Sequence, residues 1–152
     1  MEDKIRLSVL GFSFNQTQSG TYGLILAEDE GARRLIVIIV TPEAQSIAFC
    51  LQGSVPPRPL AHDLFHILTS EFGITLLKVV TYKYDNGVFH SKMHLRQGEH
   101  NIEIESRTSD AIAIALRTKA PIYTTKAIMA EQAIVFEENT SYEDFFPINS
   151  AG

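Results

Sequence analysis

Two stretches of the 152-residue chain match each other when one is shifted by 67 positions. In each stretch a predicted hairpin and strand precede a helix, so the match predicts two halves of the same design. The long helix expected at 59–72 would then be inserted between the halves. So few matching pairs also arise by coincidence, and the fold must test the repeat. The pairs are Thr41 with Thr108, Glu43 with Asp110, Ala44 with Ala111, Ile47 with Ile114, and Ala48 with Ala115.

The first half predicts three strands. Residues 4–14 alternate weakly and are rich in Ile, Leu, Val and Phe, and residues 21–27 return after a polar turn at 15–20. This pattern indicates a hairpin. Residues 34–40 form a continuous run dominated by β-branched side chains, which is typical of a strand covered on both faces.

A helix is predicted directly after this strand. Thr41 is a favourable N-cap, Pro42 suits the first helical position, and Glu43 favours the positive end of a helix. The helix is expected to end at Gly53. Apolar residues at helical spacing predict that one face of it is buried. They are Ala44, Ile47, Ala48 and Leu51.

A stiff connector, Pro56-Pro57-Arg58-Pro59, leads into a second helix predicted over residues 60–72. The apolar positions of this helix form one stripe, whereas His62, His66 and Ser70 point elsewhere. The stripe consists of Leu60, Leu64, Ile67, Leu68 and Phe72.

The second half repeats the order of the first. Strands are predicted at 74–84 and 88–96, and Asp85-Asn86-Gly87 between them is a strong hairpin signal because Asn-Gly accepts positive φ angles. The elements expected to follow are a strand at 101–106, a helix at 109–118 and a short closing strand at 121–123.

These elements predict an α+β fold, a mixed sheet from two hairpin-strand-helix halves with helices packed on one face. Residues 1–136 are expected to form one domain, which the length and a hydrophobic content of 45% allow. Residues 137–152 are acidic and unperiodic, which predicts a loosely held tail or a linker remnant. Both halves leave sheet edges that a second copy would cover, so a homo-oligomer, a dimer, is expected.

The net charge of -5 disfavours tight binding to duplex DNA, because such binding depends largely on neutralising phosphates. A nuclease needs only transient contact, so the charge does not exclude that class. A single cysteine, Cys50, excludes an internal disulfide, and no stretch approaches the roughly 20 apolar residues of a membrane span. No apolar signal core follows Met1, so a cytoplasmic protein with no membrane contact is expected.

Two turns place an arginine directly before a helix and a carboxylate within its first turns. They contain Arg58 with Asp63 and Arg107 with Asp110. Backbone N–H groups at a helix start favour phosphate, and a guanidinium adds a bidentate contact, so both arginines are candidates for binding phosphate. His62 and Asp63 would supply a general base and a metal ligand, which are the usual groups for activating water against a phosphodiester.

These motifs resemble the bifunctional nuclease domain family. The resemblance extends from about Leu7 to about Phe136, and its motifs keep their order. It implies a nuclease that degrades both DNA and RNA. The matching motifs are Arg58-Pro59, His62-Asp63-Leu64, Arg107-x-Ser109-Asp110-Ala111-Ile112-Ala113 and Ala120-Pro121-Ile122-Tyr123.

Together the residues and the resemblance assign roles. The expected catalytic residues are His62, Asp63 and Asp110. The expected ligands of a divalent cation, Mg²⁺ or Mn²⁺, are Asp63 and Asp110, with Glu105 as a weaker third. The expected phosphate-binding residues are Arg58, Arg107 and Ser109. DNA and RNA are the expected substrates.

A non-catalytic ligand-binding or protein-interaction module is the alternative. In that case ion pairs inside each turn, Arg58 with Asp63 and Arg107 with Asp110, only fix the backbone. The two hypotheses differ in one observable. In a nuclease, His62, Arg107 and the two aspartates converge in one cleft open to solvent, whereas in the alternative they are buried and mutually saturated.

Other polar residues have simpler interpretations. Glu43 lies near a helix start, where a carboxylate gains about 0.3–1 kcal/mol without any catalytic role. His66 is spaced for joint metal binding with His62, but solvent exposure is favoured for it. Cys50 has no neighbouring base and is not expected to be a nucleophile. A basic stripe on one strand is expected to be solvated, with contact to a nucleic-acid backbone as the alternative; it comprises His90, Lys92, His94 and Arg96.

The chain departs from the family pattern at four positions. Ala61 stands where threonine is usual, Thr108 where proline is usual, Glu105 where aspartate is expected, and Val40 where glycine is common. A lost hydroxyl at Ala61 and an added methylene at Glu105 would both move site atoms. They therefore bear on metal geometry and activity more than on the fold.

Overall fold

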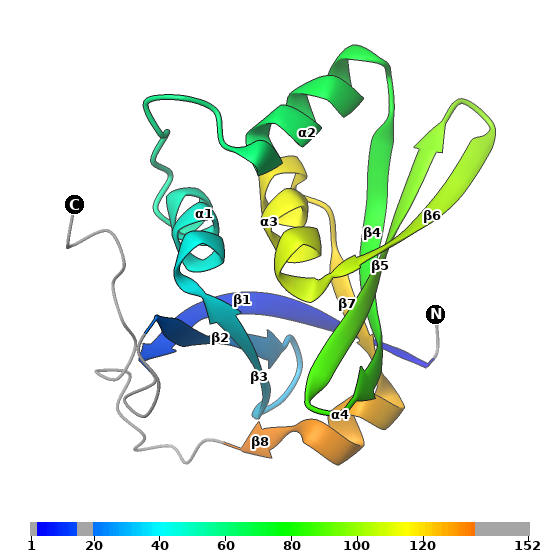
Figure 1. The fold of residues 1–152 in the computed structure, drawn as a ribbon. Helices are drawn as coiled ribbons and strands as arrows, with labels where there is room; N and C mark the ends of the chain where they lie inside the picture. The colour runs from blue at the N-terminus through cyan, green and yellow to red at the C-terminus, as the bar shows by residue number, and fades with distance from the viewer. Residues whose placement is uncertain (1–2, 15–19, 136–152) are drawn as a thin grey trace.

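The structure, a computed structural model, describes residues 3–14 and 20–135 (Figure 1). The predicted tail at 137–152 lies outside these residues, as does the predicted turn apart from Gly20. In the described ranges no helix is long and apolar enough to cross a membrane. The elements are β1 (Lys4–Phe14), β2 (Thr21–Glu28), β3 (Arg33–Val40), α1 (Thr41–Leu51), α2 (Ala61–Glu71), β4 (Thr75–Asp85), β5 (Val88–Gln97), β6 (His100–Arg107), α3 (Thr108–Thr118), β7 (Ile122–Thr125), α4 (Lys126–Gln132) and β8 (Ile134–Val135).

The strands form one mixed sheet in the order β6-β5-β4-β7-β1-β2-β3-β8. Neighbouring strands are antiparallel except for β4 and β7, which are parallel. β7 therefore joins two three-stranded meanders, β1-β2-β3 and β4-β5-β6, at the centre of the sheet. This confirms the predicted α+β fold with a mixed sheet.

The two halves follow the predicted repeat. β3 and α1 begin at residues 33 and 41, and β6 and α3 begin at residues 100 and 108, so both elements recur after 67 positions (100 less 33, 108 less 41). The helix between the halves is also present as α2. The predicted hairpin turn between β4 and β5 is confirmed by positive φ angles of 50° at Asn86 and 78° at Gly87.

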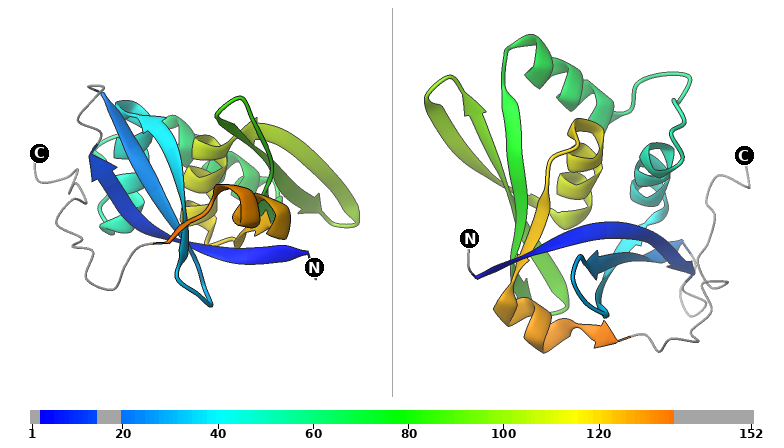
Figure 2. Two further views of the ribbon diagram at one scale, coloured as in Figure 1. Left: turned by 90° about the horizontal axis from the view of Figure 1, so that it is seen from below. Right: turned by 180° about the vertical axis from the view of Figure 1, so that it is seen from behind.

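Helices α1, α2 and α3 lie together on one side of the sheet (Figures 1 and 2). α3 packs on the sheet and contacts both α1 and α2, α1 also packs directly on β2 and β3, and five consecutive residues of α3, 111–115, are buried. On α1 the predicted apolar face is buried at Ala44, Ile47 and Ala48, whereas Leu51 is exposed. α3 is therefore the central helix, and its N-terminus meets both α1 and α2.

α2 packs on α3 and places its apolar stripe at the surface. Phe65 packs against the core and Thr69 is buried, and these residues define its inner face. Four residues of the predicted stripe lie on other faces. They are Leu64 (56% exposed), Ile67 (48%), Leu68 (58%) and Phe72 (64%). This stripe of large apolar side chains is covered by no other described part of the chain.

The predicted N-cap of α1 is wrong by one residue. Val40 occupies the cap position, and Thr41 is the first helical residue, whose hydroxyl donates to the Gly20 carbonyl at 3.2 Å. The Glu43 carboxylate instead reaches back and accepts the Val40 N–H at 3.0 Å. A carboxylate at the third helical position can satisfy this N–H without any hydroxyl at the cap.

Two short elements at the end of the described chain were not predicted from the sequence. α4 begins after Thr125, whose hydroxyl accepts the Ile128 N–H at 3.1 Å. Ile128 and Met129 join the same hydrophobic core as the central helix. β8 then pairs with β3 over two residues and partly covers that edge of the sheet.

Candidate functional site

Three helices carry a carboxylate at their third position, and only one of these carboxylates is free of a capping role. Glu43 in α1 accepts the Val40 N–H, and Asp63 in α2 accepts the Leu60 N–H at 2.8 Å. Asp110 occupies the same position in α3, which has no side-chain cap. Its carboxylate points away from its own helix start, and the unpaired N–H groups there favour an anion.

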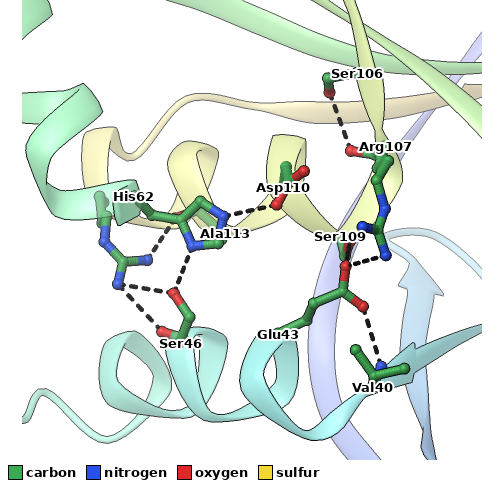
Figure 3. Close-up of polar contacts among 10 residues, drawn as sticks. Val40, Glu43, Ser46, His62, Ser106, Arg107, Ser109, Asp110 and Ala113 are labelled. Atoms are coloured by element: carbon green, nitrogen blue, oxygen red, sulfur yellow. Dashed lines mark hydrogen bonds and ion pairs between the residues drawn. The ribbon is translucent and has the colours of Figure 1, made fainter. Parts of the chain in front are cut away.

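Asp110 forms a pair with His62 across two helices. Oδ1 of Asp110 lies 2.8 Å from Nε2 of His62, and the opposite ring nitrogen, Nδ1, lies 2.6 Å from Oγ of Ser46 (Figure 3). The Asp110 side chain is 40% exposed and that of His62 is 16% exposed. The pair therefore reaches solvent at its carboxylate end.

Asp63 lies behind this pair and is fully engaged. Its Oδ2 accepts the Leu60 N–H, and its Oδ1 accepts Nε–H of Arg117 at 2.7 Å. Burial alone would raise the pKa of Asp63, but the hydrogen bonds from Arg117 and Leu60 outweigh it and hold the pKa below its ordinary value. Arg117, 5% exposed, also donates to the Ala113 carbonyl at 2.9 Å and to Ser46.

Arg107 and Ser109 meet Glu43 at the start of α3. Glu43 Oε2 lies 2.6 Å from Nη2 of Arg107 and accepts the Ser109 hydroxyl (Figure 3). The Glu43 side chain is 11% exposed, whereas that of Arg107 is 70% exposed. The guanidinium therefore lies at the surface beside a carboxylate that has two further donors, Ser109 and the Val40 N–H.

A hollow of about 540 Å³ opens beside Arg107. Its walls are residues 37–39 of β3, residues 87–90 at the start of β5, Glu43, and residues 105–109 at the junction of β6 and α3. Exposed Ile38 and Val88 give it an apolar side, and Arg107 and Ser109 give it a polar one. This surface offers space for a substrate next to the exposed guanidinium of Arg107, which is paired with Glu43. His62, Asp63 and Asp110 are not among its walls, so the predicted site residues do not converge in this one hollow.

Two predicted site residues lie apart from this cluster. Arg58 is exposed on the connector before α2 and forms no ion pair within the described residues. Glu105 lies on β6, where Oε1 accepts the Tyr82 hydroxyl and Oε2 lies 3.5 Å from Nδ1 of His90. The Tyr82 hydrogen bond holds the pKa of Glu105 below its ordinary value.

The ion pairs considered from the sequence do not form. Asp63 pairs with Arg117 and not with Arg58, and Arg107 pairs with Glu43 and not with Asp110. The predicted metal ligands are also separate, because Asp63, Asp110 and Glu105 each bind a different protein partner. In residues 3–14 and 20–135 no three His, Cys, Asp or Glu side chains gather as a metal-binding group.

The basic stripe on β5 is matched by acids on β6. Lys92 and His94 lie 3.8 and 3.5 Å from oxygens of Glu103, and His90 is beside Glu105. Burial lowers the pKa of His94 even though Glu103 opposes this shift. The stripe is thus balanced by neighbouring carboxylates, which weakens the alternative of a nucleic-acid track.

The two remaining candidates have local roles. His66 is half-buried, with Nδ1 3.4 Å from the Ser70 hydroxyl, and both ring nitrogens of His62 already have partners. Burial raises the pKa of the Cys50 thiol, which disfavours a thiolate nucleophile.

Besides Glu105, three residues depart from the family pattern, and the structure shows the position of each. Thr108 fills the first helical position of α3, where it is buried and its hydroxyl lies 2.7 Å from that of Ser91 and donates to the Phe89 carbonyl. Ala61 is the first residue of α2 and is exposed, and Val40 is the N-cap of α1. The threonine therefore adds contacts that a proline cannot make.

Three residues of the site were missed or undervalued in the sequence. Ser46 and Arg117 belong to no sequence motif. They are part of the site only because the packing of the helices places them opposite His62 and Asp63. Glu43 was interpreted as a helix-start residue, which it is, but it also binds Arg107 and Ser109. The repeat carried a signal for it, because Glu43 and Asp110 are equivalent positions in the two halves.

Residues 24–137 match the bifunctional nuclease domain family. The chain is 35% identical over 135 residues to an uncharacterized protein of Mycobacterium tuberculosis (strain CDC 1551 / Oshkosh), covering 89% of this chain and 80% of that protein. It is 26% identical over 129 residues to Bifunctional nuclease 1 of Oryza sativa subsp. indica, covering 82% of this chain and 39% of the rice protein. The chain belongs to the bifunctional nuclease domain family.

Proposed function

We propose that this protein is a nuclease of broad specificity that hydrolyses phosphodiester bonds in DNA and RNA. The observation that carries the proposal is the position of two different groups at one helix start. Asp110, paired with His62, and Arg107, beside Ser109, are separated by only two residues at the N-terminus of α3. An acid–base pair and an anion-binding group are what phosphodiester hydrolysis requires.

Arg107 is suited to the scissile phosphate. Its side chain is exposed, and the uncapped start of α3 adds backbone N–H groups that favour an anion. When Arg107 turns to a phosphate, Glu43 keeps two donors, the Ser109 hydroxyl and the Val40 N–H. The ion pair thus holds the guanidinium near the site, and the Glu43 carboxylate keeps two hydrogen bonds when the guanidinium moves.

The reaction balances with water as the only co-substrate. A water molecule gives one proton to the His62–Asp110 pair while its oxygen forms a bond to phosphorus. The bond from phosphorus to the leaving oxygen then breaks, that oxygen takes a proton from solvent, and the His62–Asp110 pair returns its proton to solvent. Removing a general base of this kind lowers rates about 10²–10⁴-fold.

A divalent cation, Mg²⁺ or Mn²⁺, is part of the proposal, although the described residues form no ready-made metal cage. Mg²⁺ is commonly held by one or two carboxylates together with substrate phosphates. Oδ2 of Asp110 has no hydrogen-bond partner among the described residues, whereas both oxygens of Asp63 and Glu105 are engaged. Asp110 is therefore the residue that would hold a cation through one of the waters that Mg²⁺ keeps, which leaves Oδ2 able to take a proton, and the cation would neutralise charge on the phosphate.

The test is cleavage of single- and double-stranded DNA and RNA by the purified full chain, with Mg²⁺, with Mn²⁺ and with a chelator. His62→Ala and Asp110→Ala are assayed beside the wild type after circular dichroism shows that both are folded. Activity that disappears in both folded variants supports the proposal. Activity that survives both substitutions assigns it to another site or to a contaminant, and an inactive wild type refutes it.

The alternative, a non-catalytic binding module, has one specific observation in its favour. Arg117 is buried, Asp63 is half-buried, and the described residues around the pair occupy its remaining donors and acceptors, as expected of residues that only fix a turn. Asp110 and Arg107 are the exposed members of the site, and this exposure favours the nuclease. An inactive wild type that still binds short oligonucleotides would support the module.

We also propose a cytoplasmic homodimer. The support for self-association is the stripe Leu64, Ile67, Leu68 and Phe72 on α2, whose four side chains are between 48% and 64% exposed. Apolar clusters of this kind on a surface mark interaction sites. The cytoplasmic location is supported by the presence of a single cysteine, which makes no disulfide within the chain.

A further inference from the structure

A series of polar side chains runs from the surface into the protein behind Asp110. It links three helices, from Asp110 in α3 through His62 in α2 and Ser46 in α1 to Arg117 in α3. Exposure falls along the series, from 40% for Asp110 and 16% for His62 to 3% for Ser46 and 5% for Arg117. The histidine is therefore the middle of the series and not its outer end.

The inner end of the series favours one placement of the hydrogens. Arg117 can only donate, and its Nη2 donates to Oγ of Ser46 at 3.1 Å. The Ser46 hydroxyl keeps its single hydrogen, which it can donate to Nδ1 of His62, 2.6 Å away and its other side-chain partner in the described chain. When Nδ1 accepts this hydrogen bond, the proton of a neutral ring lies on Nε2.

The contact of His62 with Asp110, at the outer end of the series, favours the same position of the proton. A proton on Nε2 is donated to Oδ1 of Asp110 across 2.8 Å. The other neutral form of His62 would place the Nε2 lone pair against a carboxylate oxygen at this distance, and two acceptors in contact repel each other. Both partners of the ring thus select the same tautomer.

We infer that Ser46 and Arg117 are positioning residues that hold neutral His62 in its Nε2–H form, so that Asp110 is the group that takes the proton from water. His62 has no free lone pair facing solvent in this form. It donates to one oxygen of Asp110 and fixes the carboxylate, and the second oxygen has no hydrogen-bond partner among the described residues and is the one that would take the proton. The catalytic part of this inference rests on the proposed nuclease function, whereas the tautomer does not.

The direct test is ¹⁵N NMR of the full chain, with long-range couplings to the ring protons and a pH titration that reveals the neutral ring. His62→Gln identifies the His62 signals. In the wild type, Nδ1 should have the shift of an unprotonated nitrogen and Nε2 that of a protonated one. Ser46→Ala leaves Asp110 as the one partner that selects the tautomer and should populate the Nδ1–H form in part. Ser46→Thr, which retains a hydroxyl, should restore the wild-type pattern.

The matched control is Thr69→Val. It removes a buried hydroxyl from α2, the helix of His62, but that hydroxyl bonds only the His66 carbonyl. This variant should keep both the tautomer and the activity of the wild type. A wild-type ring protonated on Nδ1, or a Ser46→Ala spectrum identical to that of the wild type, would overturn the inference.

Activity measurements distinguish the proposed nuclease function from the proposed catalytic role of the His62 tautomer. Ser46→Ala should lower kcat roughly 10- to 100-fold with little change in KM, the scale on which outer hydrogen-bond partners of a working histidine act. Ser46→Thr should recover most of this loss. Normal cleavage with a changed tautomer would refute the catalytic part of the inference and leave the nuclease standing. An inactive wild type with the expected tautomer would refute the nuclease and the catalytic part, and leave the tautomer.

Discussion

His62 and Asp110 lie 48 residues apart in the sequence, and their side chains meet at 2.8 Å between Nε2 and Oδ1. Asp110 is free to form this contact because it does not cap its own helix, unlike Glu43 and Asp63 at the equivalent third positions of α1 and α2. The carboxylate at the third position thus caps the helix in α1 and α2, but not in α3. This difference is the reason for proposing Asp110, and not Glu43 or Asp63, as the carboxylate that acts on the substrate.

Replacing Arg107 should weaken binding of nucleic acid. Arg107→Ala removes an exposed guanidinium beside the site, and each lost phosphate contact should reduce the slope of log affinity against log salt by about 1. Arg107→Lys keeps the charge but not the bidentate geometry, and should restore the slope without restoring kcat. Fluorescence anisotropy with a labelled oligonucleotide at several salt concentrations measures this. An unchanged slope in Arg107→Ala would place the phosphate elsewhere.

Replacing Arg117 should destabilise the fold. Arg117→Ala leaves the half-buried Asp63 carboxylate without its guanidinium partner, and breaking a buried pair in this way costs about 3 kcal/mol or more. Lys92→Ala breaks an exposed pair with Glu103 and should change the free energy of unfolding by about 1 kcal/mol or less. Urea unfolding followed by circular dichroism compares the two. Equal losses in both variants would show that the Arg117 pair contributes no more than a surface one.

Ionised Asp63 should stabilise the folded protein, so the free energy of unfolding should fall at acid pH. Its pKa is lower in the folded protein than in the unfolded chain, so its carboxylate stabilises the fold above the unfolded pKa of about 3.9. This contribution is lost as pH falls through that value towards the lower folded pKa. Asp63→Asn should therefore flatten the decline in urea midpoint below about pH 5. A variant whose midpoints fall in parallel with those of the wild type would contradict this role.

The stripe on α2 should mediate self-association. Leu68→Glu places a charge among Leu64, Ile67 and Phe72, and should convert a dimer to a monomer in sedimentation velocity. Val55→Glu adds the same charge at a residue that is 88% exposed on the connector, and should leave the dimer intact. A wild type that sediments as a monomer at the same concentrations would refute the proposed dimer.

Much of the fold was predictable because it depends on local signals. The hairpin at Asn86-Gly87 follows from the positive φ angles that the turn requires, and the repeat of 67 positions located the strand-to-helix turns of both halves. The N-cap of α1 was misplaced because two helix starts fit the sequence. Thr41 as N-cap would accept an N–H of the first helical turn, whereas Glu43 accepts the N–H of Val40 and makes Val40 the cap. The sequence alone does not decide between these two starts.

The site was predictable only in part, because its partners are brought together by packing. His62 and Asp110 were both singled out, but the partner of Asp63 is Arg117, which matched no motif. The sequence also did not determine which face of α2 is buried. Periodicity places Leu64 and Leu68 on one apolar stripe, but it does not show what packs against this stripe. The buried face is determined by the contact of α2 with α3 and not with the sheet.

Cleavage by Asp110→Asn compared with Asp63→Asn tests the central claim most directly. Both changes remove one carboxylate charge from the third position of a helix, but Asp63→Asn also weakens the pair with Arg117 and the cap of α2, so the comparison is made on variants that circular dichroism shows to be folded. The initial rate on a labelled oligonucleotide should fall about 10²–10⁴-fold in Asp110→Asn, because a general base is lost, whereas folded Asp63→Asn should cleave at a rate near that of the wild type. Full activity in Asp110→Asn, or equal loss in the two variants, would contradict the assignment of Asp110 as the catalytic carboxylate.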